Sequence, residues 1–148
     1  MRVEIEQVFE RSPEVTRRLL KVVRPSDEPQ AIVGKAREII GGLREADLIA
    51  TLNAHPRIGA NPTSLSPLSR REQSGDADVA TLQALAAMNE EYERTFGFRF
   101  VVFVAGRSKA EIVPVMRERL RRTRAEELAT GIDEFLAIAR DRLERIAP

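Results

Sequence analysis

The sequence of 148 residues has no cysteine, no tryptophan and only one histidine. The absence of cysteine excludes disulfide bonds, zinc–thiolate sites, iron–sulfur clusters and a thiol nucleophile. A single histidine excludes a metal site built from several imidazoles, so metal catalysis would have to depend on carboxylates. The sequence also lacks a Walker loop, a dinucleotide-binding fingerprint and a G-x-S-x-G elbow, so no motif for a nucleotide cofactor is visible.

Neither sign of charge is in excess, and no long apolar run occurs. The 24 Lys and Arg residues balance the 23 Asp and Glu residues, and a net charge of +1 favours neither nucleic acid nor an anionic membrane as a partner. No stretch approaches the roughly 18 apolar residues of a membrane span, and residues 1–10 lack the apolar core of a signal peptide. We expect a cytoplasmic protein.

The chain length and the capping residues predict one all-α domain over residues 1–148. Helices are expected over residues 13–23, 28–42 and 76–95, and from residues 108 and 123 onwards. The last two helix starts are S/T-x-x-E capping boxes, formed by Ser108 with Glu111 and by Thr123 with Glu126.

Glycine, proline and basic residues predict three further local features of the helices. Gly41 and Gly42 are expected to end a helix with a left-handed cap. Pro114 is expected to kink the helix that begins at Ser108. The basic run over residues 117–124 is expected to be a solvated helix end.

One segment has the pattern of a strand. Phe96, Phe98 and Phe100 recur at period two within an apolar run that ends near residue 104. No other segment offers a partner strand, so we expect a buried extended segment near residues 97–105 inside the helical domain. Its unpaired backbone groups would be available to bind a ligand.

His55 is the one side chain whose ordinary pKa lies near neutral pH. It follows an apolar helix and precedes a loop with Pro56 and Gly59, where a side chain is held by the scaffold but reaches solvent. This position suits a general base. The alternative is that His55 caps the helix or packs as a satisfied polar residue.

Glu72 and Arg142 each have two interpretations. Glu72 is either a carboxylate paired with His55 for acid–base work or the second member of a capping box with Ser69. Arg142 lies at the edge of the apolar face of the last helix. Its guanidinium either extends to water or is held inside to bind a carboxylate or another planar acceptor.

Five motifs taken together resemble the OHCU decarboxylase family, where OHCU is 2-oxo-4-hydroxy-4-carboxy-5-ureidoimidazoline. In order, they are Ala54-His-Pro-Arg-Ile-Gly59, Ser69-Arg-Arg-Glu-Gln-Ser74, Met88-Asn-Glu-Glu-Tyr92 with Phe96-Gly-Phe98, Gly106-Arg-Ser-Lys109, and Arg142-Leu143. The resemblance covers nearly the whole chain, from about residue 4 to residue 146. Each motif is weak alone, and the combination is specific.

The resemblance implies an all-helical bundle, a homodimer, and no metal or organic cofactor. It implies decarboxylation of OHCU to (S)-allantoin, the last step of urate breakdown, with OHCU as the small-molecule partner. The residues that match the motifs of the family are His55 and Glu72 as the catalytic pair, Pro56 and Gln73 beside them, Arg142 as a substrate-binding arginine, and Phe100, Val102 and Val104 in the stretch whose backbone contacts the substrate.

The sequence departs from the family pattern at Arg99, where a small residue or proline is usual, and at Phe103-Val104, where a cysteine or small residue is usual. We expect these departures to line the pocket. They leave open a paralogue that acts on another ureide. A non-catalytic helical interaction module is the third alternative, and an exposed apolar groove with His55 buried and unpaired would favour it.

Overall fold

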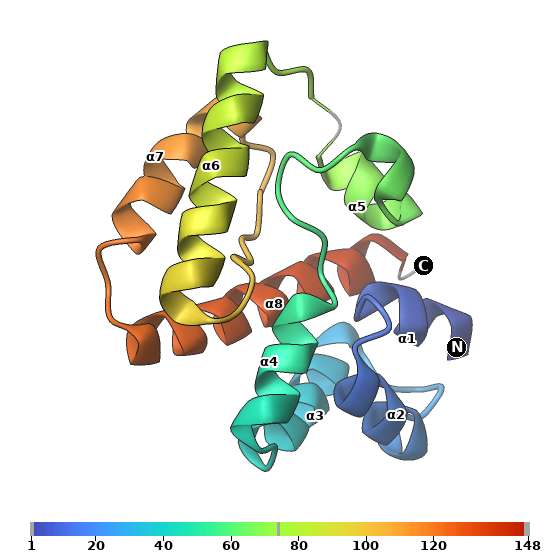
Figure 1. Ribbon diagram of the computed structural model, residues 1–148. Helices are drawn as coiled ribbons and strands as arrows, with labels where there is room; N and C mark the ends of the chain where they lie inside the picture. Colours follow the sequence, from blue (N-terminus) through green and yellow to red (C-terminus); the bar gives the residue numbers. More distant parts are fainter. Residues whose placement is uncertain (1, 74, 147–148) are drawn as a thin grey trace.

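The computed structural model describes residues 2–73 and 75–146, and within these ranges the fold is all-α, as the sequence predicted (Figure 1). The elements are α1 (Arg2–Val8), α2 (Pro13–Val22), α3 (Pro29–Gly41), α4 (Glu45–Asn53), the short 3-10 helix η1 (Pro62–Ser64), α5 (Pro67–Glu72), α6 (Val79–Phe96), α7 (Lys109–Arg119) and α8 (Arg124–Ile146). In the described part of the chain, every helix is too short or too polar to cross a membrane.

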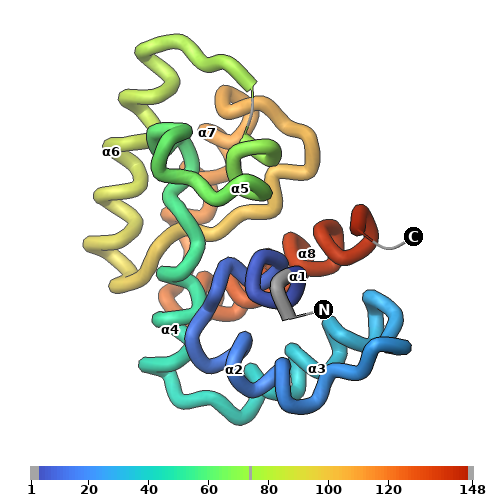
Figure 2. Tube along the Cα trace, turned by 90° about the vertical axis from the view of Figure 1, so that its right-hand side faces the viewer, coloured from blue at the N-terminus to red at the C-terminus, as the bar shows by residue number. Residues whose placement is uncertain are grey.

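The long helix α8 is the central element of the fold. Helices α1 to α4 lie on one side of it and α5 to α7 on the other, as the two views at right angles show (Figures 1 and 2). Its apolar face is buried through Ile132, Phe135, Leu136, Ala139 and Leu143. Because this face contacts α1, α3, α4 and α6, α8 joins both halves of the core.

The predicted helix starts are largely confirmed. Ser108 and Glu111 form a complete capping box at α7, and Thr123 and Glu126 exchange the equivalent bonds at α8. Helix α6 begins three residues later than expected, after its N-cap Asp78. Helix α1 was not predicted from the sequence.

The helix ends at glycine and the helix that contains Pro114 differ in part from what the sequence predicted. Gly42 has φ −101°, so the left-handed cap expected there is wrong. Gly97, with φ +83°, supplies that cap at the end of α6, where its N–H bonds to the Glu93 carbonyl. Helix α7 runs continuously from Lys109 to Arg119 through Pro114.

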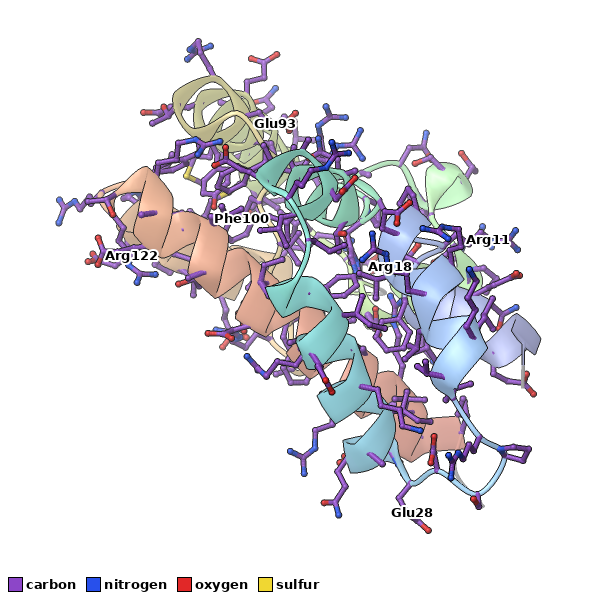
Figure 3. The ribbon with its side chains drawn as sticks, turned by 90° about the horizontal axis from the view of Figure 1, so that it is seen from below. Arg11, Arg18, Glu28, Glu93, Phe100 and Arg122 are labelled. Atoms are coloured by element: carbon purple, nitrogen blue, oxygen red, sulfur yellow. The ribbon has the colours of Figure 1, made fainter. Side chains whose placement is uncertain are left out.

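The extended segment is confirmed as irregular backbone, without helix or strand, over residues 99–104. Phe98, Phe100 and Val101 are almost fully buried, and Figure 3 shows Phe100 in the interior of the molecule. Two side chains hold the backbone from behind. Arg119 Nη1 donates to the Val101 carbonyl at 2.7 Å, and Glu134 accepts from the Phe103 N–H at 3.3 Å.

The expectation of a solvated basic helix end is wrong for Arg119. This side chain is buried, its Nε lies 2.7 Å from Glu127 Oε1, and its guanidinium lies 4.3 Å from the centre of the Phe100 ring. Tyr92 donates to the same Glu127 oxygen at 2.7 Å. The buried Glu127 carboxylate and the Val101 carbonyl supply the partners that make burial of the cation tolerable.

Gly131 tests how closely α4 and α8 pack, and Gly34 in α3 is the control. A Cβ at Gly131 would lie 3.1 Å from Leu52 Cδ1, whereas a Cβ at Gly34 meets nothing within 4 Å. We expect Gly131→Val to lower the free energy of unfolding by about 1–3 kcal/mol through overpacking. The control Gly34→Ala should raise it by about 0.5–1 kcal/mol through helix propensity. Urea denaturation of both variants measures this, and a stabilising Gly131→Val would contradict the close packing.

Candidate active site

A cavity of about 710 Å³ lies between the loop after α4, helix α5, the extended segment and the C-terminal part of α8. Its wall contains most of the residues that the sequence pointed to: His55, Pro56, Glu72, Gln73, Phe100, Val102 and Val104. These residues come from three separate stretches of the chain. Arg142 is not part of the wall and lies behind it.

His55 follows Ala54, the C-cap of α4, and has 5% of its surface exposed, so the expectation that it reaches solvent freely is wrong. Its ring stands edge-on to Phe135, with 5.2 Å between the ring centres. Its Nε2 is buried and has no hydrogen-bond partner among the described residues. An unpartnered polar atom is unusual in a protein interior, and the residue that carries it is part of the cavity wall.

The surroundings of His55 keep it uncharged at neutral pH. Burial lowers its pKa to about 4, and the positive charge of Arg142 acts in the same direction. The negative charge of Glu10 raises the pKa and only partly offsets these two effects. A neutral imidazole is the form that can accept a proton.

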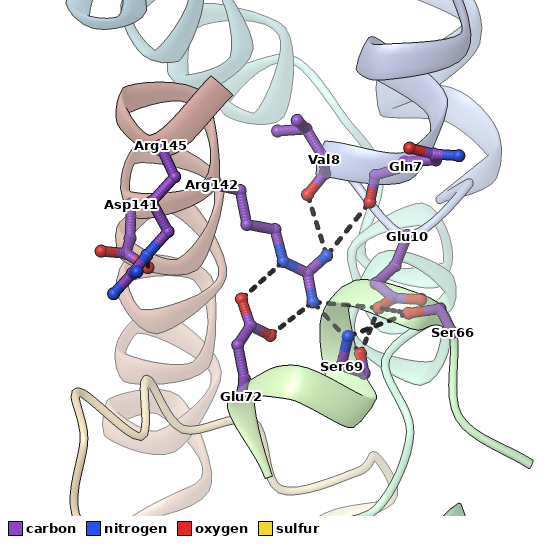
Figure 4. Close-up of polar contacts among 9 residues, drawn as sticks. All are labelled: Gln7, Val8, Glu10, Ser66, Ser69, Glu72, Asp141, Arg142 and Arg145. Carbon is purple, nitrogen blue, oxygen red and sulfur yellow. Dashed lines mark hydrogen bonds and ion pairs between the residues drawn. The ribbon is translucent and has the colours of Figure 1, made fainter. Parts of the chain in front are cut away.

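Arg142 is held inside the protein, the second of the two alternatives drawn from the sequence, with 1% of its surface exposed (Figure 4). Its Nε and Nη2 form a two-pronged pair with Glu72 at 2.8 and 2.7 Å. Its Nη1 donates to the Gln7 and Val8 carbonyls at the end of α1, at 3.1 and 3.2 Å. Nη2 also donates to Glu10 at 3.0 Å. Each of the three guanidinium nitrogens therefore has at least one acceptor.

Glu72 is the last residue of α5, and its partner is Arg142 instead of His55. The capping box expected between Ser69 and Glu72 is wrong. Pro67 opens the helix and the Ser66 hydroxyl caps it by accepting from the Ser69 N–H at 3.2 Å, which places Ser69 one turn inside. With 24% of its side chain exposed, Glu72 still faces the cavity.

Gln73 joins two loops of the cavity wall. Its Oε1 accepts from the Gly59 N–H at 2.9 Å. Gly59 has φ +81°, and a Cβ there would lie 3.2 Å from Leu85 Cδ1, so glycine suits this turn. Lys109 Nζ donates to the Gln73 and Gly75 carbonyls, both at 2.6 Å, and ties the start of α7 to this loop.

The extended segment presents two sets of backbone groups. The Val101 carbonyl and both backbone groups of Phe103 are bound by protein side chains. In extended backbone, successive residues direct their N–H and C=O to opposite sides. Phe100 and Val102, whose backbone groups have no partner among the described hydrogen bonds, therefore offer them on the other side.

Only one of the two family departures lines the cavity. Phe103 is part of the wall. Arg99 lies outside it, and its Nη1 donates to the Asn53 and His55 carbonyls at 3.0 and 3.1 Å. The expectation that Arg99 shapes the pocket directly is therefore wrong, and the residue holds the backbone that carries His55.

Glu10 was missed from the sequence. It lies in the turn between α1 and α2, and its Oε1 accepts from the Ser66 and Ser69 hydroxyls and from Arg142 Nη2, the last at 3.0 Å. The hydroxyls and the nearby Arg142 charge hold its pKa below the ordinary value despite burial, which acts the other way. No local pattern marks Glu10, because its partners are 56 to 132 positions away.

Comparison with known proteins gives one consistent family. The family model described as OHCU decarboxylase matches residues 2–144. The chain is 27% identical over 150 residues to the 2-oxo-4-hydroxy-4-carboxy-5-ureidoimidazoline decarboxylase of Halalkalicoccus jeotgali, covering 96% of this chain and 82% of that protein. A crystal structure of OHCU decarboxylase in the presence of (S)-allantoin is 25% identical, with a TM-score of 0.79 over 97% of this chain and 96% of that one.

Some relatives are much longer. The chain is 29% identical over 143 residues to the uric acid degradation bifunctional protein of Bacillus sp. (strain TB-90), covering 94% of this chain. It spans only 28% of the length of that protein. The similarity to this relative therefore concerns one part of a larger protein.

The burial of His55 predicts a specific pH dependence of stability. The unfolded chain binds a proton on His55 near pH 6.5, while the folded protein does so only near pH 4. The stability that comes from keeping His55 neutral is therefore fully present above pH 6.5 and is lost as the pH falls toward 4. Between pH 7 and pH 5, the wild type should lose on the order of 1–2 kcal/mol more free energy of unfolding than His55→Asn. Urea denaturation at both pH values measures the difference, and equal losses would argue against a neutral buried histidine.

Proposed function

Because this chain belongs to the OHCU decarboxylase family, we propose that it removes CO2 from OHCU and forms (S)-allantoin. The observation that carries the proposal is the joint placement of a neutral His55 and the Glu72 carboxylate on the wall of one cavity. Both groups lie within the region that the family model matches.

The reaction itself needs little from the protein. OHCU has a carboxylate and a hydroxyl on one ring carbon beside a C=N bond. When the bond to CO2 breaks, the electron pair left on that carbon is accepted by the adjacent C=N bond. The nitrogen of that C=N bond takes up a proton, and the hydroxyl loses its proton as its carbon becomes a carbonyl. A proton delivered to one face of the neighbouring ureido-bearing carbon then sets the S configuration. The protein has to hold the carboxylate out of the ring plane and supply the proton path.

We assign His55 to proton exchange with the hydroxyl region of the substrate, because it is neutral at pH 7 and its Nε2 has no partner among the described residues. Glu72 is fixed by Arg142 and is assigned to contact the N–H groups of the substrate directly. Arg142 keeps its place in the proposed site, but its saturated guanidinium supports a role in positioning Glu72 over a direct contact with substrate.

The remaining wall residues are proposed to bind the ring and the ureido group. The free backbone groups of Phe100 and Val102 suit a ligand rich in N–H and C=O groups, with Val104 beside them. Gln73 and Pro56 complete the wall next to His55 and Glu72.

The two alternatives fare differently. The bulky Phe103 on the wall favours, as a second candidate, a related enzyme that takes a different ureide. The interaction module is disfavoured even though His55 is buried and unpaired. The cavity beside it carries Glu72, Arg71 and Asp141 and is not an apolar groove.

Three further proposals concern the domain, the oligomeric state and the location of the protein. We propose that residues 1–148 form one catalytic domain, that the active form is a homodimer, and that the protein works in the cytoplasm. Sedimentation equilibrium should then give about twice the 16.6 kDa mass of the chain. A mass equal to one chain at micromolar concentration would contradict the homodimer.

The decisive assay generates OHCU in place from urate with urate oxidase and hydroxyisourate hydrolase, and follows (S)-allantoin by circular dichroism. The wild type should form (S)-allantoin rapidly. His55→Asn should lose about 100-fold or more in kcat, the usual contribution of an acid–base group, while keeping its far-UV spectrum. Gly34→Ala, remote from the cavity, should retain full activity. If the wild type gave only the slow racemic background, OHCU would not be its substrate.

A further inference from the structure

We propose that Glu10 is a positioning residue of this site, which holds the Arg142 guanidinium in register with Glu72 and adds a second negative charge beside the Arg142 cation. This inference deepens the proposed function and depends on it for the activity readout. Glu10 is absent from the cavity wall, so any effect on turnover has to pass through its neighbours.

The backbone that carries Glu10 is unusual. Glu10 and Arg11 have φ of +50° and +54°, a left-handed conformation that side chains other than glycine rarely adopt. The Arg11 N–H bonds to the Glu6 carbonyl at 2.7 Å and the Ser12 N–H to the Phe9 carbonyl at 2.9 Å. The tight turn directs the Glu10 carboxylate back toward α5 and α8, where its partners lie (Figure 4).

The contacts of Arg142 explain why Glu10 matters for Glu72. One edge of the guanidinium, Nε and Nη2, faces Glu72, and Nη1 faces the end of α1. Glu10 accepts from Nη2, and Ser69 contacts both Nη2 and the Glu10 carboxylate. Glu10 therefore fixes the rotation of the guanidinium, which determines the direction in which Glu72 points.

The same cluster sets the charge that His55 faces. Arg142 from α8 contributes one positive charge, Glu72 from α5 and Glu10 from the α1–α2 turn contribute one negative charge each, and the sum is −1. Without Glu10, the Arg142–Glu72 pair would be neutral. Of the groups that act on His55, Arg142 lowers its pKa and Glu10 raises it. Glu10 therefore offsets part of the effect of Arg142, and loss of its charge would make the imidazolium form of His55 less favourable.

The chain offers a direct probe, because His55 is its only histidine. An NMR pH titration of the histidine ring signals needs no assignment and no substrate. In Glu10→Gln, which keeps the shape but loses the charge, we expect the pKa of His55 to fall by at least half a unit below that of the wild type. We expect kcat to fall about tenfold and KM to change less than threefold.

The matched variant Glu10→Asp keeps the charge but withdraws the carboxylate. Its His55 pKa should lie closer to the wild type than that of Glu10→Gln, while kcat should still fall severalfold because Glu72 is less well held. A purely structural role predicts a different order, with Glu10→Gln close to the wild type in both pKa and kcat. That result would overturn the proposal.

The outcomes remain distinct if one part fails. If the wild type does not act on OHCU, the proposed function fails, and the histidine titration still decides whether Glu10 sets the charge at His55. If Glu10→Gln does not fold, Glu10→Asp decides the question. A reduced kcat at an almost unchanged KM supports the proposal, and a wild-type kcat overturns it.

Discussion

The buried guanidinium of Arg142 is the interaction on which the site depends. It binds the end of α1, the turn before α2, and helix α5, all from its place on α8. A buried charge is costly unless it is paired and hydrogen-bonded, and removing one partner leaves another charge unpaired in a low dielectric. The cavity wall and the fold therefore share one network, and a change in the network affects both.

Features that depend on local interactions were predicted correctly from the sequence. Capping boxes at Ser108 and Thr123 were found because hydroxyl and carboxylate lie three residues apart, and the period-two phenylalanines gave the extended segment because no second strand was available. The burial of Arg119, the contacts of Glu10 and the position of Ser69 were not predicted. The burial of Arg119 depends on Glu127, eight positions on, and on Val101, 18 positions back. The partners of Glu10 are 56 to 132 positions away. Ser69 was assigned as the helix cap because Ser66-Pro67, a competing helix start, was not considered.

The main residues of the candidate site were predicted from the sequence, but the contacts between them were not. The family resemblance selected His55, Glu72 and Arg142, and the structure brings them to one region. The sequence did not show that Glu72 and Glu10 both pair with Arg142, or that Glu10 is the carboxylate that raises the pKa of His55. Such pairings are decided by the angles at which α1, α5 and α8 meet.

Contacts made through the backbone of the extended segment would leave its side chains free to be substituted during evolution. Main-chain N–H and C=O groups are the same whatever the side chain, so a ligand held by the backbone of Phe100 and Val102 leaves the identities of neighbouring side chains largely free. What has to persist is the support behind the segment, here Arg119 and Glu134. Under the proposed binding mode, side chains such as Phe103 can change and reshape the cavity while the backbone groups of Phe100 and Val102 stay in place.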